Sequence, residues 1–324
     1  GHHWAARIPD YPGQFDGPQI HSHNYRSPFE PIDCVGKRVL VVGMGNSAMD
    51  IASELSQRPI ASRLFVSTRR GVWVFPKYYK GQPLDKNPAP AWMPKWLRLK
   101  LGEAMIKNLV GKMSDYGLPE PEISPFESHG TVSGEFLLRA GSGDIAMKPG
   151  IDRLDGDGVI FSDGSREQLD AIIWATGYDI KFPFFDDADL QADADNRPPP
   201  LFKRILKPEV PDLFYMGLAQ PLPTLVNFAE QQCKLVAAYL AGRYAPPSAD
   251  EMHRIIAADE AYYTGQYYAA RRHTIQLDFD HYCRALKTEL AQGEKRAAKR
   301  GFALPVPAAA GVLASSRAGW LKWR

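Results

Sequence analysis

The sequence predicts an α/β fold with a parallel sheet of the Rossmann type, and three adjacent features support this. Residues 39–42 are four apolar residues in a row, three of them β-branched, as in a strand buried on both faces. The segment Gly43-Met44-Gly45 follows and turns the backbone. Apolar residues then recur at helical spacing from Ala48 to Leu55. Strand, glycine-rich turn and helix in this order are the first unit of such a fold.

The glycine-rich turn predicts a site for the phosphates of a dinucleotide. Gly43 can adopt backbone angles closed to other residues, and Gly45 has no Cβ to keep a phosphate away. The helix that begins with Asn46, Ser47 and Ala48 offers unpaired N–H groups to an anion. Ala48 stands where the motif usually has its third glycine, so the motif alone is weak evidence. The prediction therefore rests on the order of strand, turn and helix. The alternative is an ordinary strand-to-helix turn that binds no ligand.

The end of the second predicted strand, residues 63–67, indicates NADPH rather than NADH. NAD sites usually place an acidic residue there, but this chain continues from Ser67 with Thr68-Arg69-Arg70, and no acidic residue follows until Asp85. A guanidinium pairs with a 2′-phosphate, which a carboxylate would repel. We therefore predict that Ser67, Arg69 and Arg70 contact NADPH. The alternative is that both arginines are ordinary solvated surface residues.

The composition is that of a globular protein of about two domains. The 324 residues are 44% hydrophobic and 23% charged, and the net charge of +2 gives no reason to expect a nucleic-acid partner. The three cysteines (Cys34, Cys233 and Cys283) are far apart and form no C-x-x-C pair, which fits a reducing, cytoplasmic location. No apolar run reaches the ~20 residues of a membrane span, and no His/Cys cluster indicates a metal. We expect no membrane association.

Several further elements follow from periodicity. Residues 96–113 have helical spacing, with Leu97, Leu101, Ala104, Leu109 and Met113 on the predicted buried face and lysines and arginines elsewhere. We expect this basic helix to pack on its own domain, and a membrane surface is the alternative. Residues 171–175 read as another buried strand, which the segment from Thr176 to Gly177 ends.

The C-terminal third is predicted to be mainly helical. A strand is expected over residues 213–217 and a helix over residues 224–240. Residues 248–290 read as helical and rich in aromatic side chains, which we assign to packing. From Gly293 onward Lys, Arg, Ala and Pro dominate, and we expect a poorly ordered tail.

Spaced motifs then indicate a family. Phe15-x-Gly17-x-x-x-His21-x-x-x-Tyr25, shortly before the Gly43 turn, resembles the fingerprint of flavin-dependent NADPH monooxygenases of class B. Gly45-Asn46-Ser47-Ala48 resembles the flavin-containing monooxygenase (FMO) branch in particular. The related Baeyer–Villiger enzymes generally carry Trp at the position of Tyr25. Two later motifs also resemble those of the family: Ala175-Thr176-Gly177-Tyr178, like its second linker, and Glu230-Gln231-Gln232, like its last flavin-domain helix.

This resemblance implies a domain plan. The NADPH domain, residues 31–175, would be inserted into the remaining part of a FAD/NAD(P)-type fold with two dinucleotide domains. Residues 1–30 and 176–245 would belong to the FAD domain, residues 246–300 would form C-terminal helices, and residues 301–324 would be disordered. The resemblance places Ala175, Thr176, Gly177 and Gln231 among the cofactor-binding residues.

The resemblance also implies an activity. NADPH would reduce FAD, O₂ would add to give a flavin (hydro)peroxide, and this would oxygenate a soft nitrogen or sulfur atom of a small organic substrate. Since the cofactor carries the chemistry, no catalytic side chain is singled out. A Baeyer–Villiger ketone monooxygenase and an inactive NADP-binding fragment are the alternatives, and a homodimer is left open.

One departure from the family concerns the first phosphate site. The family begins with another strand, glycine-rich turn and helix, which holds the FAD diphosphate, and this sequence has no such unit. We expect an N-terminally truncated form in which FAD binding belongs to the full-length protein. Expressed alone, the chain should carry little FAD.

Overall fold

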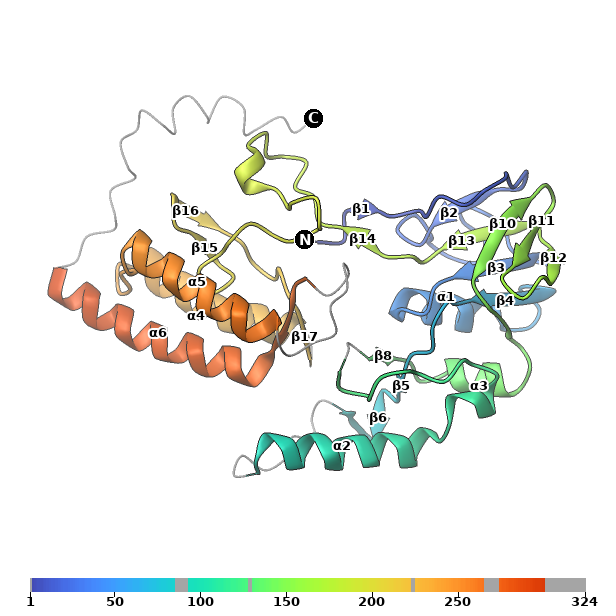
Figure 1. The fold of residues 1–324 in the computed structure, drawn as a ribbon, viewed down its shortest axis with the longest axis horizontal. Helices are drawn as coiled ribbons and strands as arrows, with labels where there is room; N and C mark the ends of the chain where they lie inside the picture. The colour runs from blue at the N-terminus through green and yellow to red at the C-terminus, as the bar shows by residue number, and fades with distance from the viewer. Residues whose placement is uncertain (1, 85–92, 128–129, 223–224, 265–273, 301–324) are drawn as a thin grey trace. The chain divides into compact units, whose positions relative to one another are not determined.

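The computed structural model describes residues 2–84, 93–127, 130–222, 225–264 and 274–300. The chain divides into two compact units, seen in Figure 1. The sheet unit is residues 6–178, and the helical unit is residues 1–5 together with residues 179–324. The chain passes between them at two short paired strands, β1 (Ala5–Ala6) and β14 (Tyr178–Asp179).

A five-stranded parallel sheet forms the centre of the sheet unit and confirms the predicted fold class. The strand order is β2-β13-β3-β4-β9, so the strand after the glycine-rich turn lies beside the strand before it. The strands are β2 (Gln19–His21), β3 (Arg38–Val42), β4 (Arg63–Ser67), β9 (Ala146–Lys148) and β13 (Ala171–Trp174). The predicted strands over residues 39–42, 63–67 and 171–175 correspond to β3, β4 and β13 within one residue at each end.

The sheet is buried on both faces because its side chains alternate between two cores. Val39 and Val41 point to the face covered by α1 (Asn46–Leu55), whose apolar side fills the first core. Leu40 and Val42 point to the opposite face. That face is covered by an antiparallel sheet of three strands, β10 (Ile151–Asp155), β11 (Gly158–Phe161) and β12 (Arg166–Gln168), as Figure 1 shows. The four-residue apolar run is thus a central strand.

The long connection after β4 contains helices and several two-residue strands. The helices are α2 (Lys95–Val110), which the helical spacing of residues 96–113 predicted, and α3 (Phe136–Gly141). The strands are β5 (Val74–Phe75), β6 (Tyr78–Tyr79), β7 (Gln82–Pro83) and β8 (Thr131–Val132), and a 3₁₀ turn covers Met113–Tyr116. β5 pairs with β8 in parallel, and β6 pairs with β7 in an antiparallel hairpin. Two-residue strands have no period to detect, which is why they were missed.

The predicted buried face of residues 96–113 was wrong in part, because Met113 is buried in the core but Ala104 is exposed. Leu101 and Leu109 are exposed, whereas Ile106 and Val110 are buried in the core of the sheet unit. Only the C-terminal half of α2 packs against that core. The apolar residues of its first half therefore could not indicate which face is inside.

Three helices and two strand pairs make up most of the helical unit. α4 (Leu225–Leu240), α5 (Ala249–Thr264) and α6 (Phe279–Arg300) share a core with aromatic side chains such as Phe228, Tyr244 and Tyr282. β15 (Leu206–Lys207) pairs with β16 (Val210–Phe214), and β17 (Gln220–Leu222) pairs in parallel with β18 (Gln276–Asp278). A 3₁₀ turn covers Ala188–Leu190.

Three expectations for this unit need correction. The strand predicted over residues 213–217 lies earlier, at β16, and the helix predicted over residues 248–290 is interrupted by β18. The chain after Gly293 continues α6 as far as Arg300 instead of forming a loose tail. Its last turns are held because Arg296 Nε donates to the Ala245 carbonyl at 2.9 Å and its guanidinium pairs with buried Glu289. The predicted tail over residues 301–324 lies outside the described residues.

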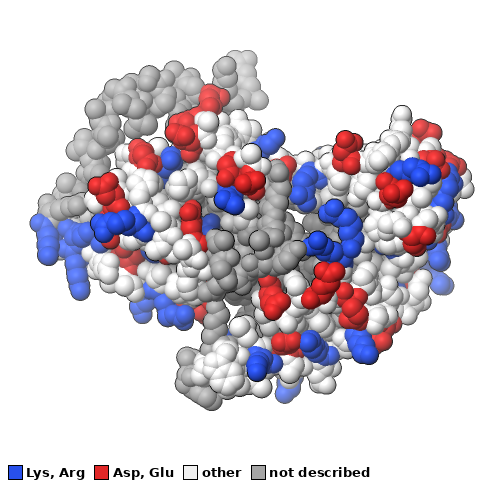
Figure 2. Space-filling model, in the orientation of Figure 1, with Lys and Arg blue, Asp and Glu red and all other residues white. Residues whose placement is uncertain are grey.

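Charged side chains of both signs are mixed on the visible face of the molecule in Figure 2. None of the described helices is both long and apolar enough to cross a lipid bilayer.

Candidate functional site

The turn between β3 and α1 requires glycine at its first position. Gly43 has φ +126°, a conformation that L side chains rarely adopt. A Cβ there would lie 2.4 Å from the Ala175 carbonyl oxygen, at the end of neighbouring β13. The Gly43 N–H donates to the Ser67 carbonyl at 2.9 Å, which ties the turn to β4 as well. The ends of three strands therefore meet at this glycine.

The second glycine leaves the start of α1 open. Gly45 is the N-cap, with extended backbone (φ −82°, ψ 177°) and no side-chain cap, and a Cβ there would meet nothing within 4 Å. Gly45, Asn46 and Ser47 are exposed, and the first turn of α1 contains no acidic residue. The first amides of the helix are thus accessible, and nothing nearby on α1 repels an anion. These features fit the phosphates of a dinucleotide.

Met44 and Asn46 in the predicted turn are both hydrogen-bonded to strand β8. The Asn46 side-chain oxygen accepts from the Val132 N–H at 2.9 Å, and the Thr131 hydroxyl donates to the Met44 carbonyl at 2.9 Å. Strand β8 is thereby fastened to the turn. Ala48 is fully buried, so the methyl group that replaces the third glycine packs in the core.

The end of β4 lies at the same edge of the sheet, because Ser67 is paired with Val42, directly before the turn. The Ser67 side chain is buried and its hydroxyl donates to the Pro149 carbonyl at 2.7 Å, so it fixes the strand end. Thr68 donates to the Arg70 carbonyl at 2.7 Å and shapes the following turn. Arg69 and Arg70 are exposed. Two guanidinium groups thus follow the strand next to the glycine-rich turn.

The third strand end carries the predicted Ala175-Thr176-Gly177 turn. The Ala175 N–H donates to the Val42 carbonyl at 2.9 Å, and Gly177 has φ +88°. His21 Nδ1 accepts from the His23 N–H at 3.0 Å, so the ring proton is on Nε2 and donates to the Gly177 carbonyl at 3.0 Å. Burial lowers the pKa of His21, which keeps this tautomer neutral.

The fingerprint residues found by resemblance are structural supports of this edge. Phe15 is buried, and a Cβ on Gly17 would lie 2.6 Å from its ring, so the small residue makes room for the aromatic one. The Tyr25 hydroxyl donates to the Glu54 carboxylate on α1 at 3.0 Å. Burial, followed by this hydrogen bond, raises the pKa of Tyr25. Together with His21, these contacts fix α1 and the turn after β13.

Gln231 belongs to the helical unit, and its neighbour Gln232 has the clearer structural role. Gln231 lies half-buried on α4, and its oxygen accepts from Lys234 Nζ at 2.9 Å. Gln232 is fully buried and satisfies two backbone groups, accepting from the Gly217 N–H at 2.8 Å and donating to the Arg204 carbonyl at 3.1 Å. Besides the family motif, the helical spacing of Phe228, Gln232 and Leu235 indicates that Gln232 lies on the buried side of α4.

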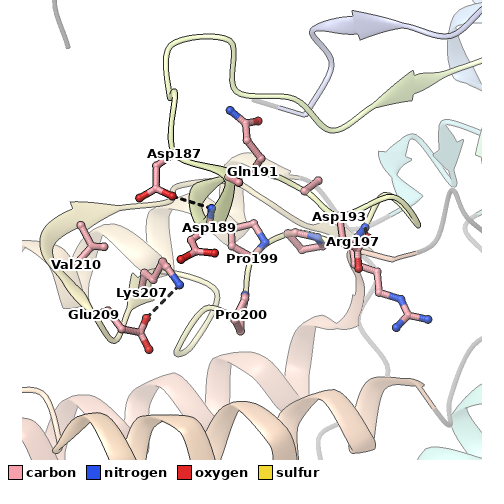
Figure 3. Close-up of a pocket in the computed structure, with 13 residues that line it drawn as sticks. Asp187, Asp189, Gln191, Asp193, Arg197, Pro199, Pro200, Lys207, Glu209 and Val210 are labelled. Atoms are coloured by element: carbon pink, nitrogen blue, oxygen red, sulfur yellow. Dashed lines mark hydrogen bonds and ion pairs between the residues drawn. The ribbon is translucent and has the colours of Figure 1, made fainter. Parts of the chain in front are cut away.

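A separate cavity of about 560 Å³ lies within the helical unit, and Figure 3 shows its lining. None of the predicted site residues lines it. Its charged groups are engaged locally: Lys207 pairs with Glu209 at 3.1 Å, and the Asp187 carboxylate accepts from the Asp189 N–H at 2.8 Å. Across the part of the chain that the structure describes, no group of three or more His, Cys, Asp or Glu residues could hold a metal ion.

Comparison with known proteins agrees with the motifs. The family model described as "Flavin-binding monooxygenase-like" matches residues 1–295. Flavin-containing monooxygenase 5 of Oryctolagus cuniculus is 33% identical over 294 residues, which cover 86% of this chain and 53% of that protein. Dimethylaniline monooxygenase [N-oxide-forming] 2 of Rattus norvegicus is 33% identical over 276 residues, 79% of this chain and 49% of the relative. The chain thus spans about half the length of these relatives.

Solved structures show the same fold at lower sequence identity. Cyclohexanone monooxygenase from Rhodococcus sp. Phi1, solved with NADP⁺, superposes with a TM-score of 0.59 and 15% identity, covering 91% of this chain and 72% of that one. Because the family model matches nearly all of the chain, and the fingerprint residues and the glycine-rich turn form the framework described above, this chain belongs to the flavin-binding monooxygenase-like family.

Proposed function

We propose that this chain carries the NADPH-binding part of an NADPH- and FAD-dependent monooxygenase that oxygenates a soft nitrogen or sulfur atom of a small organic substrate. The main support for NADPH binding is the accessible N-terminus of α1 and the two exposed arginines that follow the neighbouring strand β4. Family membership supports FAD as the second cofactor and O₂ as the co-substrate. The chain spans about half of its relatives, so the activity is proposed for the protein that contains it.

The residues of the sheet unit would act by binding and positioning. The exposed amides from Gly45 to Ser47 would hold the cofactor diphosphate, and Arg69 and Arg70 would pair with the 2′-phosphate. His21 would hold the turn at Gly177 in place through its fixed hydrogen bond. Bound flavin supplies the redox and oxygen chemistry, so the protein needs no acid–base pair of its own.

Nitrogen or sulfur oxygenation is favoured over ketone oxygenation by the curated relatives. One relative at 33% identity is named a flavin-containing monooxygenase, and another is named for N-oxide formation. The cyclohexanone monooxygenase is similar at only 15% identity, which supports the fold alone. Baeyer–Villiger chemistry remains the second candidate. The three free cysteines support the proposed cytoplasmic location.

Two measurements test the proposal. Fluorescence titration of the purified chain should show NADPH binding at least tenfold tighter than NADH binding, because only NADPH offers the phosphate that the arginines bind. Equal affinity would contradict the cofactor assignment. The full-length protein supplied with NADPH should convert methyl phenyl sulfide to its sulfoxide faster than cyclohexanone to its lactone. Lactone as the dominant product would establish the second candidate.

A further inference from the structure

Three consecutive carbonyl groups, those of residues 148–150 at the end of β9 and just after it, are fixed by hydrogen bonds. The donors are Thr68 N–H to Lys148 at 3.0 Å, Ser67 Oγ to Pro149 at 2.7 Å and Ser162 N–H to Gly150 at 2.8 Å. Two of these donors directly precede Arg69 in the chain. Residues 148–150, which we call the β9 platform, are therefore held firmly beside Arg69.

The chain is also fixed on the other side of Arg69. The Thr68 hydroxyl donates to the Arg70 carbonyl at 2.7 Å. Gly71 lies so close to the segment from Pro119 to Glu120 that a Cβ there would be 2.2 Å from the Pro119 carbonyl oxygen. The backbone around Arg69 is thus held by contacts before and after it, and the freedom that is left belongs to the side chain.

The aliphatic part of the Arg69 side chain crosses the β9 platform at Gly150. A Cβ on Gly150 would lie 2.9 Å from Arg69 Cγ and 3.8 Å from both its Cβ and its Cδ. Carbon atoms pack at about 3.5–4.0 Å, so a methyl group at Gly150 would displace the arginine side chain. The φ angle of Gly150 is not positive, so its own backbone does not require glycine. The contact with Arg69 is what favours glycine here.

The charged end of Arg69 is available to a ligand. Arg69 is exposed, and its guanidinium forms no ion pair or hydrogen bond with the residues that the structure describes. An arginine that moves freely in water loses rotamer freedom when it binds an anion. Because the aliphatic part of Arg69 already lies against the β9 platform, less of that freedom remains to be lost.

We propose that Gly150 is a positioning residue for cofactor selection, because it lets the Arg69 side chain lie across the β9 platform and so orders the guanidinium before the 2′-phosphate of NADPH binds. The inference rests on the proposed function and adds to it a residue that acts only through Arg69. NADH has no 2′-phosphate, so its binding should not depend on Gly150.

The test is Gly150→Ala, with Arg69→Ala and the double variant as matched controls. Fluorescence titration should show about two- to tenfold weaker NADPH binding for Gly150→Ala than for the wild type, because the arginine must be ordered anew, and unchanged NADH binding. Arg69→Ala should lose at least as much NADPH affinity. Adding Gly150→Ala to Arg69→Ala should cause no further loss, since the Cγ atom that the methyl group displaces is gone.

Three titration results would overturn the inference. The first is an NADPH affinity of Gly150→Ala equal to that of the wild type, and the second is an NADH affinity that falls as much as the NADPH affinity. The third is an NADPH loss from Gly150→Ala that persists in the Arg69→Ala background. Thermal unfolding adds a check on the fold: a fall in melting temperature that also persists in that background would show that the glycine serves the fold instead.

The wild-type chain separates this inference from the proposed function. Equal binding of NADPH and NADH by the wild type would refute the cofactor assignment, and the role of Gly150 with it. A wild type that prefers NADPH, together with a Gly150→Ala variant of the same preference, would refute the role of Gly150 alone.

Discussion

Replacing Gly45 by valine should remove NADPH binding and leave the fold intact. The backbone of Gly45 is extended (φ −82°, ψ 177°), which a β-branched residue adopts readily, and its Cβ would meet no protein atom within 4 Å. The isopropyl group would instead occupy the open space beside the first amides of α1. That space is where we place the cofactor diphosphate.

The structure sets the size of the two effects. Valine is a poorer N-cap than glycine but restricts the unfolded chain, so the free energy of unfolding should change by less than about 1 kcal/mol. Each charge-assisted hydrogen bond from an amide to a phosphate contributes roughly 1.5–3 kcal/mol. Loss of even one should therefore weaken NADPH binding about tenfold to a hundredfold.

Gly43→Ala is the matched control in the same turn, because its cost falls on the fold. Gly43 has φ +126°, and its Cβ would lie 2.4 Å from the Ala175 carbonyl oxygen. A non-glycine residue in such a conformation costs about 1–3 kcal/mol before the clash is counted. The melting temperature should therefore fall clearly for Gly43→Ala and hardly at all for Gly45→Val.

Thermal unfolding and fluorescence titration of both variants with NADPH check these expectations. A folded Gly45→Val variant that binds NADPH as tightly as the wild type would show that the phosphates lie elsewhere. A large fall in its melting temperature would show instead that the space beside Gly45 is not open.

Three further outcomes are expected. Arg69→Ala combined with Arg70→Ala should weaken NADPH binding tenfold to a hundredfold in titration and leave NADH binding unchanged; equal losses would refute the 2′-phosphate assignment. Tyr25→Phe should lower the free energy of unfolding in urea by about 1 kcal/mol, since the hydrogen bond to α1 is lost, and an unchanged midpoint would refute that role. Because the pKa of His21 is below its ordinary value, the folded chain binds fewer protons, so stability should fall as pH drops below about 7. His21→Gln should show less of this fall in unfolding curves at different pH values, and an identical pH profile would contradict it.

The sequence predicted the centre of the sheet unit because several local signals agree there. β3 is a continuous apolar run, α1 has a clear helical period, and the two glycines lie between them. Each signal alone is weak, but strand, turn and helix in this order leave few alternatives. The same residues are buried or exposed as those patterns require.

The signals failed where tertiary contacts decide the structure. β18 interrupts a predicted helix because pairing with β17 holds Gln276–Asp278 extended, and that partner is far away in the sequence. α6 continues past Gly293 because the glycine packs against Tyr244, where a Cβ would lie 2.0 Å from the ring. Composition suggested a loose tail, but packing and the Glu289–Arg296 ion pair override it.

The fingerprint residues were identified by resemblance alone, because their roles depend on contacts with distant parts of the chain that no local pattern reveals. His21 reaches Gly177, which is 156 residues away in the sequence, and Tyr25 reaches Glu54, which is 29 residues away. A short motif thus links α1 to the turn after β13. The Tyr25 hydroxyl is bonded to Glu54 on α1, so we expect tyrosine in place of tryptophan here to affect the framework. The proposed preference for nitrogen or sulfur over ketones therefore rests on the curated relatives, and a Tyr25→Trp variant should change stability without exchanging one product class for the other.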